Sequence, residues 1–105
     1  MTAKIFIAER KLLFALKGQE ERRPLIVRVS APVVVAEGTV DFQVADGTAV
    51  CTVEFQGLGE DSIREYGADS IQALSLAVNI DRYLSRLKKK YDFYFPDGEP
   101  YFEDA

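Results

Sequence analysis

The chain has 105 residues, a length typical of one domain. It is 48% hydrophobic and 29% charged, and its many aromatic and branched side chains favour a folded globular protein over disorder. No stretch of roughly 18 residues lacks charge, which excludes a membrane-spanning helix. Glu9, Arg10 and Lys11 interrupt the apolar core that a signal peptide needs. We therefore expect a single cytoplasmic domain over residues 1–105, with no membrane partner.

Histidine is absent from the chain, and Cys51 is the only cysteine. These two facts exclude histidine-activated nucleophiles, histidine-ligated zinc, an intrachain disulfide and a metal cage made of cysteines. The residue types that remain for catalysis are carboxylates, Lys, Tyr, Ser and Thr. We therefore predict no catalytic residue, no metal site and no cofactor.

The formal net charge is −4, from 13 basic and 17 acidic residues. Nucleic-acid-binding proteins usually present a strongly basic face, so this balance argues against such a partner. The basic residues gather between Arg82 and Lys90, and acidic residues follow between Asp97 and Asp104. We interpret the two blocks as a solvated helix end and an acidic tail, which are also able to pair within or between subunits.

The first 57 residues have the alternating pattern of β-strands. The apolar side of the first strand, over residues 3–16, changes near Glu9–Lys11, which suggests a bulge. Pro32 ends the second strand or marks an edge, and Asp46-Gly47 is a tight-turn signal. The expected strands lie at 3–16, 25–30, 40–44 and 51–56, with a short apolar run at 33–35. This order predicts an antiparallel meander of about four strands.

One long amphipathic helix is predicted over residues 70–90. Asp69 is a favourable N-cap, and Gln72 stands three residues later, as in a capping box. Ile71, Leu74 and Val78 widen the apolar stripe in the first three turns, so the N-terminal half is expected to be more deeply buried. The stripe itself consists of Ala73, Leu76, Ala77, Ile80, Tyr83, Leu84 and Leu87. The fold class is therefore predicted as α+β, with this helix packed on the sheet and a C-terminal aromatic hairpin beyond it.

The hairpin is indicated by a Pro96-Asp97-Gly98 turn between two aromatic triplets. A hairpin has two alternating faces, so it cannot bury all of its aromatic side chains. We interpret the surplus as an interface with a protein partner or with a second copy in a homodimer. The expected interface residues are Phe93, Tyr94, Phe95, Tyr101 and Phe102.

Three other groups of residues have a functional and a structural interpretation, and we favour the structural one for each. Gly67–Ser70 suits a helix cap better than an anion site, because the Asp69 carboxylate already occupies the helix N-terminus. Cys51 lies among apolar strand residues, as a buried thiol does. The acidic residues of the next loop match no calcium or magnesium signature, so we expect solvated charge. They are Glu60, Asp61, Glu65 and Asp69.

The strand pattern C-x-V-x-F-x-G-L-G, followed by Y-G-A-D-S-I-Q-A-L-S-L-A, resembles a family of small uncharacterised bacterial proteins. In that family a strand ends in Gly-Leu and a helix opens with G-x-D-S-x-Q-A-L-x-L-A. The matching positions are Cys51, Gly57, Leu58, Gly67, Asp69, Ser70, Gln72, Ala73, Leu74 and Ala77. The resemblance implies a related fold and a bacterial, cytoplasmic setting, and it implies no catalytic residue.

These observations favour a non-catalytic protein–protein interaction module of an immunity or accessory type. The contact surface is expected to combine the aromatic tail with an exposed sheet edge. The alternative is a small-ligand-binding or enzymatic domain that uses Tyr and carboxylate side chains in a cleft between sheet and helix.

Overall fold

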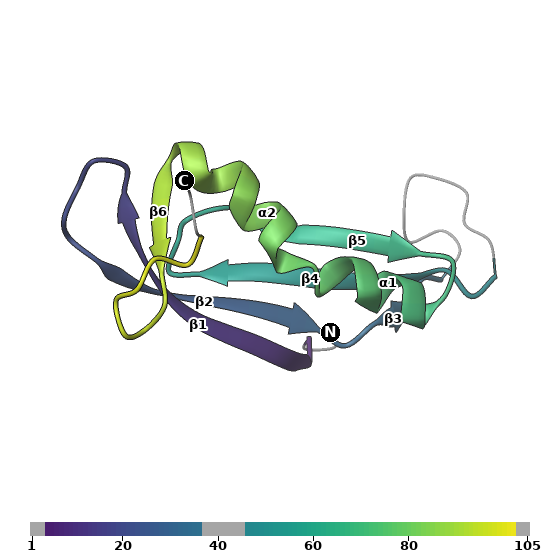
Figure 1. Cartoon of the computed structure of the whole chain (residues 1–105). Coiled ribbons are helices and arrows are strands. Elements are labelled where there is room, and N and C mark those ends of the chain that lie inside the picture. Colours follow the sequence, from purple (N-terminus) through teal and green to yellow (C-terminus); the bar gives the residue numbers. More distant parts are fainter. Residues whose placement is uncertain (1–3, 37–45, 103–105) are drawn as a thin grey trace.

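The computed structural model describes residues 4–36 and 46–102, so the strand predicted at 40–44 lies outside the described residues. Helices cover one face of an antiparallel sheet (Figure 1). The elements in chain order are β1 (Phe6–Leu16), β2 (Arg23–Ser30), β3 (Val33–Val34), β4 (Ala49–Gln56), β5 (Ile63–Gly67), α1 (Ser70–Ala77), α2 (Ile80–Arg86), the 3₁₀ turn η1 (Leu87–Lys89) and β6 (Tyr91–Tyr94).

The sheet has six strands over the described residues, so the prediction of a four-stranded meander is wrong. Its order is β3-β4-β2-β1-β6, and β5 pairs with β4. We predicted no strand at Ile63–Gly67, because five residues that include Arg64 and Glu65 give a weak strand signal. β6 was expected to pair within the terminal hairpin. It pairs instead with the end of β1, as in Phe14 with Phe93.

The terminal turn forms as expected, since the Gly98 N–H donates to the Phe95 carbonyl at 2.9 Å. The second arm adds only one bridge, between Tyr94 and Pro100. In β1 the irregularity falls between Phe6 and Ala8, earlier than the predicted bulge near Glu9–Lys11.

The predicted single helix over residues 70–90 is wrong: it is two short helices and a 3₁₀ turn. The break lies at Asn79, whose φ of −79° and ψ of 63° are not helical. Val78 closes α1 by donating its N–H to the Leu74 carbonyl at 2.9 Å. Val and Asn are weak helix formers, and Asn favours caps, which explains a break at this pair.

The apolar stripe continues across the break, since Ala73, Ala77, Ile80, Tyr83 and Leu84 are all buried. The predicted widening of the stripe is confirmed for Leu74, which packs against the core, and is wrong for the other two residues. Ile71 is 77% exposed and Val78 50% exposed, so these two side chains point away from the core.

The predicted N-cap is confirmed. The Asp69 carboxylate accepts the Gln72 N–H at 2.8 Å. The Gln72 side chain reaches back to the Ala68 N–H at 2.6 Å, one residue before the position that a capping box uses.

The helix layer packs closely on β4 and β5 because small residues line the contact. Ala49, Ala73 and Ala77 are completely buried. A Cβ atom at Gly67 would lie 2.8 Å from the carbonyl carbon of Gln72 and 2.9 Å from the Cα of Ala73. Only glycine fits there. None of the helices in the part of the chain that the structure describes is long and apolar enough to cross a bilayer.

The cap gives the first testable prediction. Asp69→Ala leaves the Gln72 N–H without its acceptor, so we expect the free energy of unfolding to fall by about 0.5–2 kcal/mol. Urea unfolding measures this loss. Asp61→Ala is the matched control, because Asp61 is exposed and forms no hydrogen bond or ion pair with the described residues. The control should change stability by less than about 0.5 kcal/mol. Equal stability of Asp69→Ala and the control would contradict the cap assignment.

Candidate functional site

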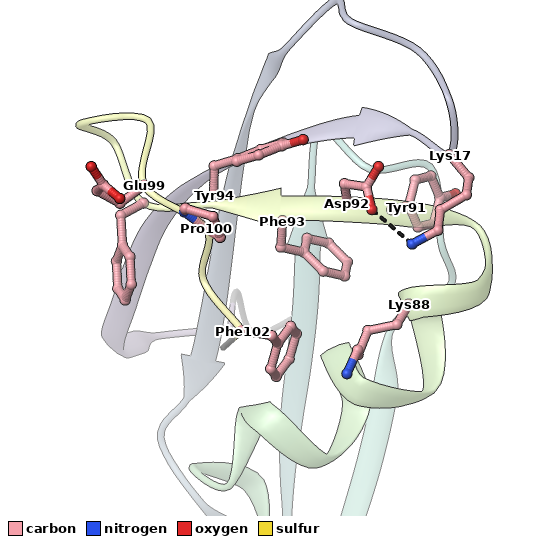
Figure 2. Close-up of a pocket in the computed structure, with 10 residues that line it drawn as sticks. Lys17, Lys88, Tyr91, Asp92, Phe93, Tyr94, Glu99, Pro100 and Phe102 are labelled. Carbon is pink, nitrogen blue, oxygen red and sulfur yellow. Dashed lines mark hydrogen bonds and ion pairs between the residues drawn. The ribbon is translucent and has the colours of Figure 1, made fainter. Parts of the chain in front are cut away.

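Four of the predicted interface aromatics, Phe93, Tyr94, Phe95 and Phe102, line a cavity of about 650 Å³ beside β6. Figure 2 shows the Phe93 and Phe102 rings close together in it, with Lys88 beside them. The Lys88 ammonium lies 4.8 Å from the centre of the Phe102 ring. Lys17 forms an ion pair of 2.7 Å with Asp92 at the rim. The cavity is open and has a mixed aromatic and charged lining.

Most of these aromatic side chains already have partners within the chain. Phe93 is buried, and Tyr101 and Phe102 pack against the core. Tyr94 stacks under Arg22, whose guanidinium carbon lies 3.7 Å from the ring centre. Phe95 stays 41% exposed. The aromatic surplus is therefore smaller than the sequence suggested, and the interface at these residues stays a prediction.

Tyr101 holds the C-terminal segment against β1 and α2. Its hydroxyl accepts a hydrogen bond from Arg10 at 2.6 Å and donates one to Asp81. Burial and the hydrogen bond to Asp81 raise the pKa of Tyr101. This contact fixes the tail to two elements that are far apart in the sequence.

A second tyrosine–carboxylate pair joins β6 to the loop after β4. The Tyr91 hydroxyl donates to Glu60 at 2.6 Å, and Lys90 lies 3.4 Å from the same carboxylate oxygen. The hydrogen bond and burial raise the pKa of Tyr91 to about 12, and the same hydrogen bond lowers the pKa of Glu60.

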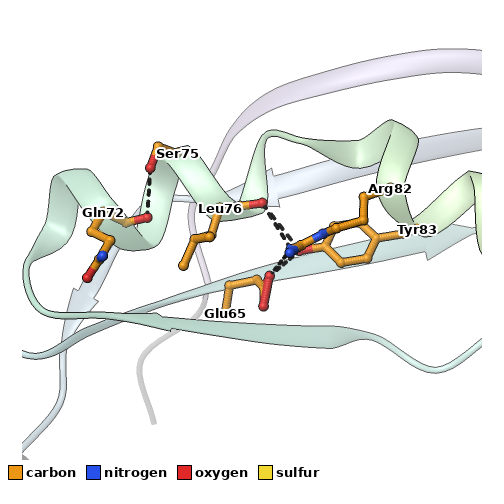
Figure 3. A network of polar contacts seen from close by, with 6 residues as sticks. All are labelled: Glu65, Gln72, Ser75, Leu76, Arg82 and Tyr83. Carbon is orange, nitrogen blue, oxygen red and sulfur yellow. Dashed lines mark hydrogen bonds and ion pairs between the residues drawn. The ribbon is translucent and has the colours of Figure 1, made fainter.

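A third pair joins β5 to α2 (Figure 3). The Tyr83 hydroxyl donates to Glu65 at 2.6 Å, and Arg82 forms an ion pair with the same carboxylate. Arg82 also donates to the Tyr83 hydroxyl at 2.9 Å. Burial, with the hydrogen bond to Glu65, raises the pKa of Tyr83 to about 12. The network connects the edge strand to the helix that follows the break.

The three tyrosines are hydrogen-bond donors at neutral pH, since the pKa of each is raised. A tyrosine that acts as a general base needs the opposite shift. Each pair also connects two elements of the fold. These tyrosine–carboxylate pairs therefore stabilise tertiary contacts.

The acidic residues singled out in the sequence have separate roles. Glu60 binds Tyr91, Glu65 binds Arg82 and Asp69 caps α1. Across residues 4–36 and 46–102, no three acidic or cysteine side chains come together in a way that suits a metal ion. The buried thiol is confirmed: Cys51 is completely buried, and burial raises its pKa.

The opposite face of the sheet carries no helix among the described residues (Figure 1). Side chains alternate along a strand, so the residues that stand between the core residues of β4 and β5 face outward here, as Val50, Thr52 and Arg64 do. The Thr52 backbone N–H on β4 has a hydrogen-bond acceptor within the chain. Pro32 interrupts the edge after β2, and the Ser30 hydroxyl accepts the Thr52 N–H at 2.8 Å.

A groove of about 610 Å³ lies at one end of this face, and we name it the valine groove. Ile5, Val33 and Val34 line it and are 69%, 60% and 65% exposed. Arg64 stands at its side and forms no ion pair with the described residues. The sequence analysis missed this site, although the run of three valines without alternation was its signal.

Charge on the uncovered face differs from that of the whole protein. Over Lys4 and strands β1, β2, β4 and β5, its cations outnumber its carboxylates by four to two. They are Lys4, Lys11, Arg28 and Arg64, against Glu9 and Glu54. Two ion pairs form, Lys4 with Glu54 at 3.7 Å and Arg28 with Glu9 at 3.6 Å. The face is net positive on a protein whose formal charge is −4.

Comparison of the chain with protein-family models, curated proteins and solved structures found no match. The resemblance to a family of small bacterial proteins therefore stays a prediction, and the function has to be argued from the surfaces themselves.

The Tyr91 pair predicts a specific alkaline behaviour. A tyrosine pKa raised from 10 to about 12 adds stability below pH 10, and this stability is lost as the pH rises to about 12. Tyr91→Phe should therefore lower the free energy of unfolding by about 1 kcal/mol below pH 10. The difference from the wild type should shrink above that pH.

Urea unfolding across this pH range measures the effect. Tyr94→Phe is the control, because the Tyr94 hydroxyl makes no hydrogen bond with the described residues. A wild-type minus Tyr91→Phe difference that stays constant with pH would contradict the pairing.

Proposed function

We propose that this protein is a non-catalytic protein-binding module and that its partner docks in the valine groove. The observation that carries the proposal is a groove on the uncovered sheet face with an apolar lining, in which the exposed Val33 of β3 lies beside Val50 of β4. Single exposed apolar side chains are ordinary on protein surfaces. A contiguous set around a groove is typical of a surface that another chain covers.

The energetics of the groove suit a protein contact. Full burial of a valine or isoleucine side chain contributes up to about 1.5–3 kcal/mol. Val33 and Val50 are paired on neighbouring strands and form the apolar centre that interfaces place inside a polar rim. Lys4 and Arg64 supply such a rim here.

A catalytic alternative has less support. In an enzyme that uses Tyr and carboxylates, these side chains converge on an open cleft, and their pKa values are shifted to suit proton transfer. The tyrosines at 83, 91 and 101 each bond a carboxylate that holds two elements together. The valine groove itself offers Thr52 and Ser30 hydroxyls with no base beside them among its lining residues.

Self-association through the C-terminal aromatics remains a proposal of its own. Phe95 is the exposed part of that segment and is what a second copy would cover. The cytoplasmic location and the immunity or accessory type of function are likewise proposals that rest on the sequence.

The test compares partner capture by three forms of the chain. Wild type, Val33→Asp and Ile71→Asp are immobilised, and bound proteins are identified by mass spectrometry. Ile71 is a matched control, because it is 77% exposed on the helix side. We expect a protein that is held by wild type and Ile71→Asp and lost from Val33→Asp. The same proteins on all three forms, or none on any, would contradict the proposal.

A further inference from the structure

We propose that the occupant of the valine groove is an acidic apolar segment of a partner protein, with a carboxylate placed against Arg64. This inference rests on the proposed function and adds the chemistry of the partner. It draws on three observations: the unpaired guanidinium, the charge of the uncovered face and the apolar lining.

Arg64 is the cation that the groove leaves available. It lies on β5 opposite Thr52, so its side chain stands on the uncovered face beside the groove floor. Among the described residues it has no carboxylate partner, whereas Lys4 across the groove is paired with Glu54. Guanidinium groups bind carboxylates through two parallel hydrogen bonds, so a carboxylate of the occupant has a fixed place to bind.

The net positive charge of the whole face also favours an acidic occupant at longer range. Lys11 is the second cation on it without an ion pair to the described residues. The face therefore attracts an acidic segment and repels a basic one. A symmetric pairing of two copies through this face would bring the two net positive surfaces together, which disfavours a second copy as the occupant.

The apolar lining determines the rest of the partner. Val33 and Val50 have no polar side-chain atom, so the occupant must bring apolar side chains to them. An extended segment that alternates apolar and acidic residues meets both requirements, because its apolar side chains share one face and its carboxylates lie within reach of the rim.

The probes are two synthetic peptides of equal length labelled with fluorescein. One alternates Val with Glu and the other alternates Val with Lys. Fluorescence anisotropy at low salt measures their affinity for the full chain. We expect the acidic peptide to bind at least about tenfold more tightly than the basic one. Arg64→Glu should abolish this preference, Arg64→Lys should retain part of it, and Val33→Asp should weaken binding of the acidic peptide.

Each other outcome overturns the assignment. Equal binding of the two peptides, or an acidic preference that survives Arg64→Glu, would contradict the charge argument while leaving the proposed function intact. Binding of neither peptide would also contradict the inference. Binding of decanoate without the acidic peptide would assign the groove to a fatty acid instead. Failure of the proposed function itself is measured separately, as partner capture that Val33→Asp does not change. Circular dichroism and urea unfolding establish that each variant is folded.

Discussion

The architecture depends on the close approach of α1 to β5 at Gly67. The backbone of Ala73 sits where a side chain at Gly67 would be, and Ala73 cannot move away freely because its N–H bonds the Asp69 carbonyl at 3.1 Å. Ala49 and Ala77 extend the same tight contact along the sheet. This contact fixes the helix layer on one face, and the opposite face is left to Val50, Thr52 and Arg64.

Three tyrosine–carboxylate pairs extend this arrangement to the rest of the chain. Tyr83 joins α2 to the edge strand, Tyr91 joins β6 to the loop after β4, and Tyr101 joins the tail to α2. Each hydroxyl donates to a carboxylate that also forms an ion pair: Glu65 with Arg82, Glu60 with Lys90 and Asp81 with Arg10. The polar chemistry of the helix side is therefore used for stability. Among the described residues, the uncovered face keeps the exposed Val33 and, at Arg64, a guanidinium without an ion pair, which is why we assign binding to that face.

The features that follow from local chemistry were predictable from the sequence. The Asp69 cap, the buried stripe from Ala73 to Leu84, the end of β2 before Pro32 and the buried Cys51 all depend on nearby residues. The features that depend on distant pairing were not. β5 is a strand because β4 provides its hydrogen bonds, and β6 joins β1 across about 75 residues. The break at Asn79 was missed because the apolar stripe runs through it unchanged. The valine groove was missed because its residues meet only once the sheet has formed.

The most direct test of the account is the free energy of unfolding of Gly67→Ala, measured by urea titration in the wild-type and Ala73→Gly backgrounds. The added Cβ would meet backbone atoms of Gln72 and Ala73, so removing the Ala73 side chain gives it no room. We expect a loss of at least about 1–3 kcal/mol from Gly67→Ala, of the same size in both backgrounds. Unfolding of Gly67→Ala at the wild-type urea midpoint, or its rescue by Ala73→Gly, would contradict the claim that this contact sets which face of the sheet is covered.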